Sequence, residues 1–150
     1  MMKRLLLIDD DTVFLNLLKR RLSAYAQVSV ASSVHGALPL IASQQWNIIC
    51  SDINMRDGTG IDIYSFMERH NCKADFILMT AHLQPEAMQQ KAISKVIIWQ
   101  KTSPDFLPAF RRLLMEANDF SPTLDSVYMR LSQNSQPNSD TPDMNSRKER

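Results

Sequence analysis

Two short apolar runs in this chain end in carboxylates. Asp9 and Asp10 follow the run at residues 5–8, and Asp52 follows the run at residues 47–51. An acid at the end of a short buried strand is costly to place there unless another group compensates for its charge. Divalent cations such as Mg²⁺ prefer oxygen ligands, and one or two carboxylates with a backbone carbonyl can hold them. These acids are therefore candidate metal ligands.

Two further apolar runs end in residues that can bind a phosphoryl group. The run at residues 76–79 leads into Thr80, and the run at residues 96–100 leads into Lys101. A hydroxyl donates a hydrogen bond to a phosphoryl oxygen, and an ammonium pairs with its charge. If the four strand ends converge, Asp52 can act as the nucleophile of a phosphoryl transfer.

These residues need a scaffold that brings the strand ends together, and the hydrophobic pattern predicts one. Short apolar runs alternate with segments of helical period. The expected strands are residues 5–8, 27–31, 47–52, 76–79 and 95–100, and the expected helices begin near residues 12, 33, 61, 85 and 103. Alternating strands and helices require right-handed crossovers and a parallel sheet covered on both faces. We expect an α/β fold, a three-layer flavodoxin-like (βα)5 sandwich with strand order 2-1-3-4-5.

Helix details follow from caps and prolines. Asp11 or Thr12 can cap the first helix, in which we expect one buried face formed by Phe14, Leu17, Leu18, Leu22 and Tyr25. Gly36 and Pro39 predict a kinked second helix after a Ser33 cap, and Pro108 predicts distorted first turns in the last helix, which should begin at Ser103 and Pro104. We expect Trp99 in the core.

The last part of the chain differs in composition. We expect one domain over residues 1–118 and a tail over residues 119–150. Leu124, Val127, Tyr128 and Leu131 share one helical face, which predicts a short amphipathic helix over residues 121–131. Residues 132–150 contain one large apolar side chain and predict disorder. A tail of this length is too short for a DNA-binding or catalytic domain.

Charge and cysteine content exclude several classes of protein. The net charge of +1 gives no reason to expect nucleic-acid binding or attraction to a membrane surface. The apolar run after Met1-Met2-Lys3-Arg4 is too short for a secretory or membrane-spanning segment. The two cysteines have no metal-binding spacing and predict reduced thiols in a cytoplasmic protein.

On these residues, the chain resembles the receiver domain of two-component response regulators from residue 3 to about residue 117. The matching motifs are Asp9-Asp10, Asp52 followed by Met55 and Gly58, Thr80-Ala81, and Lys101. The resemblance implies that Asp52 is the phosphoacceptor and that Asp9 and Asp10 hold Mg²⁺ with it. The Asn54 backbone carbonyl would complete the protein ligands.

The resemblance also assigns the remaining site positions. Thr80, with Ala81 after it, would be the switch hydroxyl, and Lys101 would be the cation that senses the phosphoryl group. Asn54 and His82 occupy the positions that tune phosphoryl lifetime in this family. We thus expect a signalling module without enzymatic output of its own.

Several residues depart from the family pattern. Arg56 and Thr102 stand where receivers usually have proline, so the Lys101-Thr102 bond is an open question between cis and trans. Ile98 replaces the switch aromatic, so the threonine–aromatic coupling of the family lacks its aromatic partner here. A degenerate receiver that binds its partner without phosphate is therefore an alternative.

The resemblance implies particular partners. The phosphoryl donor would be a histidine kinase or a histidine phosphotransfer protein. The output protein is unknown and would bind the face of the fourth helix, fifth strand and fifth helix, or the tail. A second copy of the chain is a further candidate partner.

A rival enzyme reading comes from residues 9–13. Their sequence fits Asp-x-Asp-x-Thr/Val, the nucleophile motif of haloacid-dehalogenase-type phosphohydrolases. In that reading Asp9 is the nucleophile and Asp11 the general acid. No second acidic pair follows residues 76–79, where such enzymes place further metal ligands, which disfavours this reading.

Overall fold

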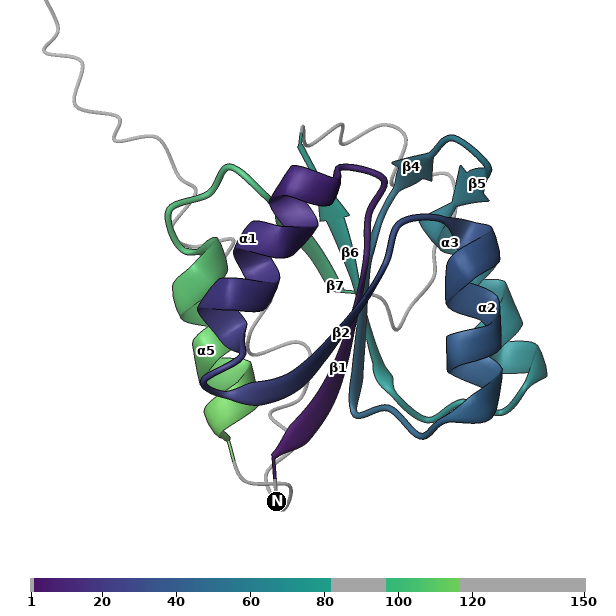
Figure 1. Cartoon of the computed structure of the whole chain (residues 1–150), viewed down its shortest axis with the longest axis horizontal. Coiled ribbons are helices and arrows are strands. Elements are labelled where there is room, and N and C mark those ends of the chain that lie inside the picture. Colours follow the sequence, from purple (N-terminus) through teal and green to yellow (C-terminus); the bar gives the residue numbers. More distant parts are fainter. Residues whose placement is uncertain (1, 82–96, 117–150) are drawn as a thin grey trace, which may run out of the picture.

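A parallel five-stranded sheet forms the centre of the protein, for which the computed structural model describes residues 2–81 and 97–116 (Figure 1). The strands are β1 (Lys3–Ile8), β2 (Ala26–Ala31), β3 (Ile48–Asp52), β6 (Asp75–Thr80) and β7 (Ile97–Gln100), in the order β2-β1-β3-β6-β7. The predicted fold class and strand order are confirmed, because the two strands between β3 and β6 lie outside this sheet. They form a separate hairpin of β4 (Asn54–Met55) and β5 (Gly58–Thr59).

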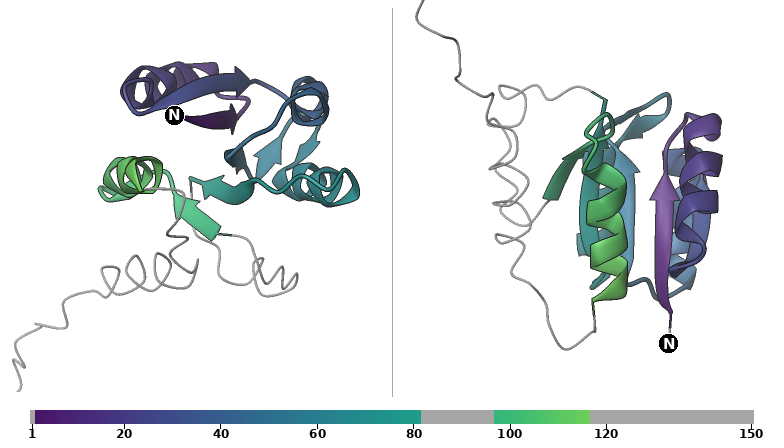
Figure 2. Two further views of the ribbon diagram at one scale, coloured as in Figure 1. Left: turned by 90° about the horizontal axis from the view of Figure 1, so that it is seen from below. Right: turned by 90° about the vertical axis from the view of Figure 1, so that its left-hand side faces the viewer.

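Helices cover both faces of the sheet, which gives three layers (Figures 1 and 2). The first face carries α1 (Thr12–Leu22) and α5 (Phe106–Met115), and the second carries α2 (Val34–Ser43) and α3 (Gly60–Arg69). The helix expected to begin near residue 85 and the tail after residue 116 lie outside the described residues, as do the first two residues of the expected fifth strand.

The two layers of core follow from the alternation of side chains along each strand. Leu5 and Leu7 of β1 pack with α1 and α5, whereas Leu6 and Ile8 pack with α2 and α3. All four are fully buried. Strands buried on both faces read as continuous apolar runs, which is why these segments lack polar alternation. Trp99 is buried in the α1–α5 layer, as predicted.

The expected face of α1 wrongly included Leu17 and omitted Leu15. Leu17 is 49% exposed, whereas Leu15, Leu18 and Leu22 are buried. With 3.6 residues per turn, Leu17 lies about 130° around the helix from the middle of that buried face. Phe14 and Tyr25 flank the same core and are partly buried.

Among the described residues, α2 and α5 contain a proline, and each runs unbroken over its length. Pro39 lies inside α2, which Ser33 caps as predicted by accepting the Gly36 N–H at 2.9 Å. Pro108 is the third residue of α5, where the backbone N–H has no acceptor within the helix, so the proline removes no hydrogen bond. The helix begins at Phe106 instead of at Ser103.

Candidate functional site

Three carboxylates meet at the carboxyl ends of β1 and β3. These strands are neighbours in the sheet, with Ile8 level with Ser51, so the residues that follow them lie side by side. One oxygen from each of Asp9, Asp10 and Asp52 lies within 4.8 Å of the others. Asp9 is fully buried and Asp52 is partly exposed. The sequence predicted this convergence.

Lys101 supplies the positive charge that these acids need. Its Nζ lies 2.5 Å from Asp9 Oδ2 and 3.3 Å from Asp52 Oδ1, and its side chain is 14% exposed. The residue follows β7, the edge strand beyond β6, so the long stem reaches back toward the middle of the sheet. The Lys101 backbone N–H donates to the Thr80 carbonyl at 2.8 Å, which fixes the start of that stem.

The ionisation of the site reflects this arrangement. Burial raises the pKa of Asp52 and the charge of Asp9 raises it further, while Lys101 opposes both effects. Burial alone would lower the pKa of Lys101, but its hydrogen bond to Asp9 and the charges of Asp9 and Asp52 outweigh burial and raise that pKa. Lys101 is therefore held as an ammonium next to Asp52.

Asp11 has a structural role at the start of α1. It is the N-cap residue, and its Oδ1 accepts the Phe14 N–H at 3.0 Å. Its own N–H donates to Asp9 Oδ1 at 2.9 Å. Because the Asp11 carboxylate is engaged in capping the helix, this geometry disfavours the general-acid role that the phosphohydrolase reading requires.

The loop after Asp52 contains a short β-hairpin. Asn54 and Met55 pair with Gly58 and Thr59 in the β4–β5 hairpin. At the tip of the hairpin, Asp57 Oδ1 accepts the Val34 N–H at 3.0 Å and Oδ2 accepts the His35 N–H at 2.9 Å. The Asp57 carboxylate therefore ties the hairpin to the first turn of α2.

Gly60 allows the same loop to pass close to Asp52. A Cβ at Gly60 would lie 2.7 Å from the Asp52 carbonyl and would also collide with the Leu78 side chain. The Gly60 N–H donates to the Ile53 carbonyl at 2.8 Å, and Thr59 with Asp62 forms a capping box at the start of α3. The loop is thus held at its base as well as at its tip.

The other predicted positions are placed as follows. Thr80 is buried at the end of β6, Ala81 after it is exposed, and Asn54 is exposed on the hairpin. Ile98 is half-buried and packs in the α2–α3 layer. The Lys101-Thr102 bond is trans, which answers the question that Thr102 raised. His82 lies outside the described residues.

Two contacts near the site were not predicted from the sequence. The Phe14 ring lies under the Lys101 ammonium, and Asp57 binds α2. Phe14 was expected only in the buried face of its helix. The first turn of α2 carries no acid, but neither does that of α1 or α5, so the sequence holds no signal that singles out α2 as the partner of Asp57.

The residues at the carboxyl ends of β1 and β3 fit a magnesium ion. Asp9, Asp10 and Asp52 each offer a carboxylate oxygen as a ligand atom. Because Mg²⁺ keeps several waters when a protein binds it, three carboxylates are enough protein ligands. The three carboxylates also outnumber the one Lys101 ammonium that pairs with them, which leaves negative charge for a cation to balance.

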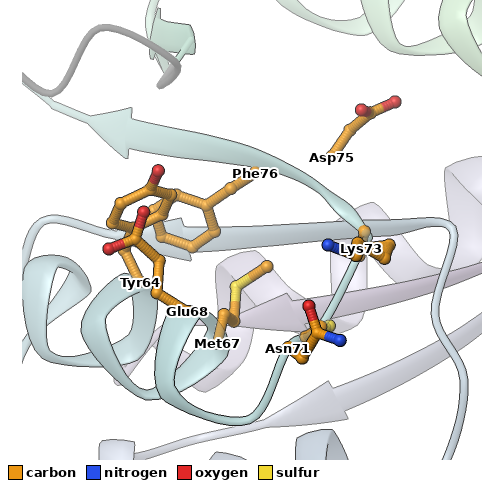
Figure 3. Close-up of a pocket in the computed structure, with 9 residues that line it drawn as sticks. Tyr64, Met67, Glu68, Asn71, Lys73, Asp75 and Phe76 are labelled. Atoms are coloured by element: carbon orange, nitrogen blue, oxygen red, sulfur yellow. The ribbon is translucent and has the colours of Figure 1, made fainter.

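A separate pocket of about 400 Å³ lies at the other end of β6 (Figure 3). Its walls include Tyr64 and Met67 of α3 and Asp75 and Phe76 of β6, with the Tyr64 and Phe76 rings 5.4 Å apart. Burial raises the pKa of Asp75. Because Asp75 begins the strand that Thr80 ends, this pocket takes no part in the acidic site.

Comparison with known proteins agrees with the geometry. The family model of the response regulator receiver domain matches residues 5–97. No curated protein sequence matches the chain. In the part of the chain that the structure describes, no helix is long and apolar enough to cross a membrane.

Solved structures share the fold at low sequence identity. Chemotaxis protein CheY4 of Vibrio cholerae has a TM-score of 0.65 and 22% identity, over 77% of this chain and 100% of its own. A Burkholderia pseudomallei response regulator, solved with a phosphorylated aspartic acid, a calcium ion and citrate, has a TM-score of 0.66 and 19% identity, over 89% of this chain and 75% of its own. TrrA of Thermotoga maritima, in complex with Mg²⁺-BeF, has a TM-score of 0.63 and 23% identity, over 76% of this chain and 100% of its own.

Proposed function

Since this chain belongs to the response regulator receiver domain family, we propose that it accepts a phosphoryl group on Asp52 and signals through protein contacts. The observation that carries the proposal is the placement of Asp52 beside Asp9 and Asp10 and 3.3 Å from the Lys101 ammonium. An acid whose pKa is raised by burial, next to a fixed ammonium, is a typical arrangement at functional sites.

The transfer proceeds by displacement at phosphorus. An Asp52 carboxylate oxygen forms the new O–P bond while the N–P bond of a phosphohistidine breaks, and the imidazole nitrogen of the donor keeps the electron pair. Asp9, Asp10, Asp52 and the Asn54 carbonyl would hold Mg²⁺, which, when bound, neutralises the charge of the phosphoryl oxygens.

The other residues of the proposed site bind the product. The Lys101 ammonium exchanges one of its carboxylate partners for a phosphoryl oxygen. Thr80, followed by Ala81, donates a hydrogen bond to a second phosphoryl oxygen. Asn54 and His82 set the lifetime of the acyl phosphate. Ile98 at the aromatic switch position limits how far movement of Thr80 is relayed.

The proposed partners follow from this chemistry. A histidine kinase or a histidine phosphotransfer protein supplies the phosphoryl group in the cytoplasm. The output protein contacts the face that includes β7 and α5, or the tail at residues 119–150. A second copy of the chain is a further candidate partner that would bind the output face. The receiver domain in this proposal spans residues 1–118.

Phosphorylation by a small-molecule phosphodonor with Mg²⁺ tests the proposal. We expect one acid-labile adduct on Asp52, lost in Asp52→Asn and in the presence of EDTA. Asp11→Asn serves as a control, since this proposal gives Asp11 no chemical role. An adduct on Asp9 with loss of turnover in Asp11→Asn would favour the phosphohydrolase reading.

The second candidate function is a phosphate-independent interaction module. Ile98 favours it, because an aliphatic side chain at the switch position is half-buried in the structure as it stands. This candidate predicts equal partner affinity for the wild type and Asp52→Asn, with or without a phosphodonor. A change in affinity upon phosphorylation would exclude it.

A further inference from the structure

The Lys101 ammonium has an aromatic neighbour besides its two carboxylates. Its Nζ lies 4.7 Å from the centroid of the Phe14 ring, within the range of a cation–π interaction. The first turn of α1 thus contributes to the charged site through an uncharged side chain. Its contribution differs from that of Asp9 and Asp52 because a ring attracts the ammonium without binding a proton or a metal.

Phe14 is held at its backbone and at its ring. At the backbone, the Phe14 N–H donates to the Asp11 carboxylate, and the Asp11 N–H donates to the Asp9 carboxylate. The Phe14 ring itself packs against the ring of Phe106 in α5, with centroids 6.1 Å apart. Phe106 is itself buried against Trp99 and Phe110 at centroid distances of 6.0 and 5.4 Å. The Phe14 ring therefore has little freedom to move away from Lys101.

A fixed ring matters because lysine is otherwise a flexible group. Its four-carbon stem and rotating ammonium define no single direction of approach. The proposed function, on which this inference rests, requires Lys101 to exchange a carboxylate partner for a phosphoryl oxygen. During that exchange the bonds to Asp9 and Asp52 change, whereas the attraction of the ring does not depend on which anion is bound.

We propose that Phe14 is a positioning residue that holds the Lys101 ammonium against the acceptor both before and after phosphorylation. In this proposal Phe14 acts through Lys101, and it has no direct role on the phosphoryl group or the metal. The aromatic face is the property that matters, so tyrosine is an adequate replacement and leucine is not.

The first test needs no phosphorylation. The ring current of Phe14 should shift the side-chain proton resonances of Lys101 upfield, and the Lys101→Arg variant identifies those resonances by their loss. We expect the shift to persist in Phe14→Tyr and to disappear in Phe14→Leu. Unshifted Lys101 resonances in the wild type would overturn the proposal.

The second test measures the rate of phosphorylation of Asp52 by acetyl phosphate with Mg²⁺ in the full chain. We expect Phe14→Leu to slow the reaction about threefold to tenfold and Phe14→Tyr to keep it within about twofold of the wild type. An unchanged rate in Phe14→Leu would overturn the proposal.

Tyr25→Leu is the matched control. Tyr25 flanks the same core and lies 4.9 Å from the Arg111 guanidinium, so this variant removes an equivalent cation–π contact far from the site. We expect the wild-type rate, and an equal loss in both leucine variants would show a general packing effect and overturn the proposal. If the wild type itself forms no adduct, the proposed function fails, and the Lys101 resonances still show whether the ring holds the ammonium.

Discussion

At the scale of single residues, the Lys101 ammonium stabilises two acids that are otherwise hard to place. Asp9 is fully buried, and its Oδ2 lies 2.5 Å from Lys101 Nζ. Removing one partner of a buried ion pair leaves an uncompensated charge. In Lys101→Met we therefore expect the free energy of unfolding to fall by about 3 kcal/mol without Mg²⁺.

Mg²⁺ should restore part of that loss, since a ligand that binds only the folded state stabilises it. Urea unfolding with EDTA and with Mg²⁺ measures both values. Lys73→Met, a change at an exposed lysine, provides the control and should alter stability by less than about 0.5 kcal/mol. Equal stability of Lys101→Met and the wild type in EDTA would contradict the prediction.

Two glycines give a second prediction at this scale. In Gly60→Ala the new Cβ would meet the Asp52 carbonyl and the Leu78 side chain, and overpacking of this kind costs about 1–3 kcal/mol. In Gly36→Ala the Cβ meets only Ser33 Oγ, at 3.1 Å, and helix propensity favours alanine by up to about 1 kcal/mol. Chemical denaturation should show a loss for the first variant and a change within about 1 kcal/mol for the second. A Gly60→Ala protein as stable as the wild type would show that the backbone beside Asp52 can shift freely.

At the scale of elements, the hydrogen bonds from Val34 and His35 lower the pKa of Asp57. A carboxyl whose folded pKa lies below its unfolded value of about 3.9 stabilises the fold above that value. This contribution is lost as the pH falls through the folded pKa. We expect Asp57→Asn to be less stable than the wild type at pH 7 and to differ progressively less in acid, which thermal melts between pH 7 and pH 2 would show.

Asp105→Asn is the control for that experiment. Asp105 is the N-cap residue of α5, but its side chain accepts no capping hydrogen bond, so this variant has no such bond to lose in acid. A constant difference between Asp57→Asn and the wild type across the whole pH range would exclude the role of the Asp57 charge.

The elements also show what could be predicted from the sequence. The meeting of Asp9, Asp10 and Asp52 was predictable, because parallel neighbouring strands place their carboxyl ends at one edge of the sheet. The link from Asp57 to α2 was not, because local spacing does not say which helix begins beside a loop. The contact of Phe14 with Lys101 was not predictable either, because it depends on how α1 packs against α5. The exposure of Leu17 depends on how α1 is rotated about its own axis.

At the scale of the whole molecule, the fold continues beyond the part that the family model matches. That match ends at residue 97, yet β7 pairs with β6 through Gln100, and α5 completes the layer that contains α1. Lys101 is therefore placed at the site by the edge of the sheet. A movement of Lys101 upon phosphorylation would act on the strand that also carries Trp99, two residues earlier.

Trp99 should report that movement. Its ring packs edge-on against Phe110, with centroids 4.8 Å apart, in the α1–α5 layer, whereas Trp46 lies in the α2–α3 layer and donates to the Leu40 carbonyl at 2.9 Å. In Trp46→Phe the fluorescence comes from Trp99 alone. We expect its intensity to change when a phosphodonor and Mg²⁺ are added, because the partners of Lys101 change.

The same variant with Asp52→Asn should show no such change, which separates phosphorylation from binding of Mg²⁺ or donor. If the fluorescence of Trp46→Phe stays constant while Asp52 carries the adduct, the edge of the sheet does not respond. Phosphorylation would then act only at the surface around Asp52, and the output partner would have to contact that surface directly.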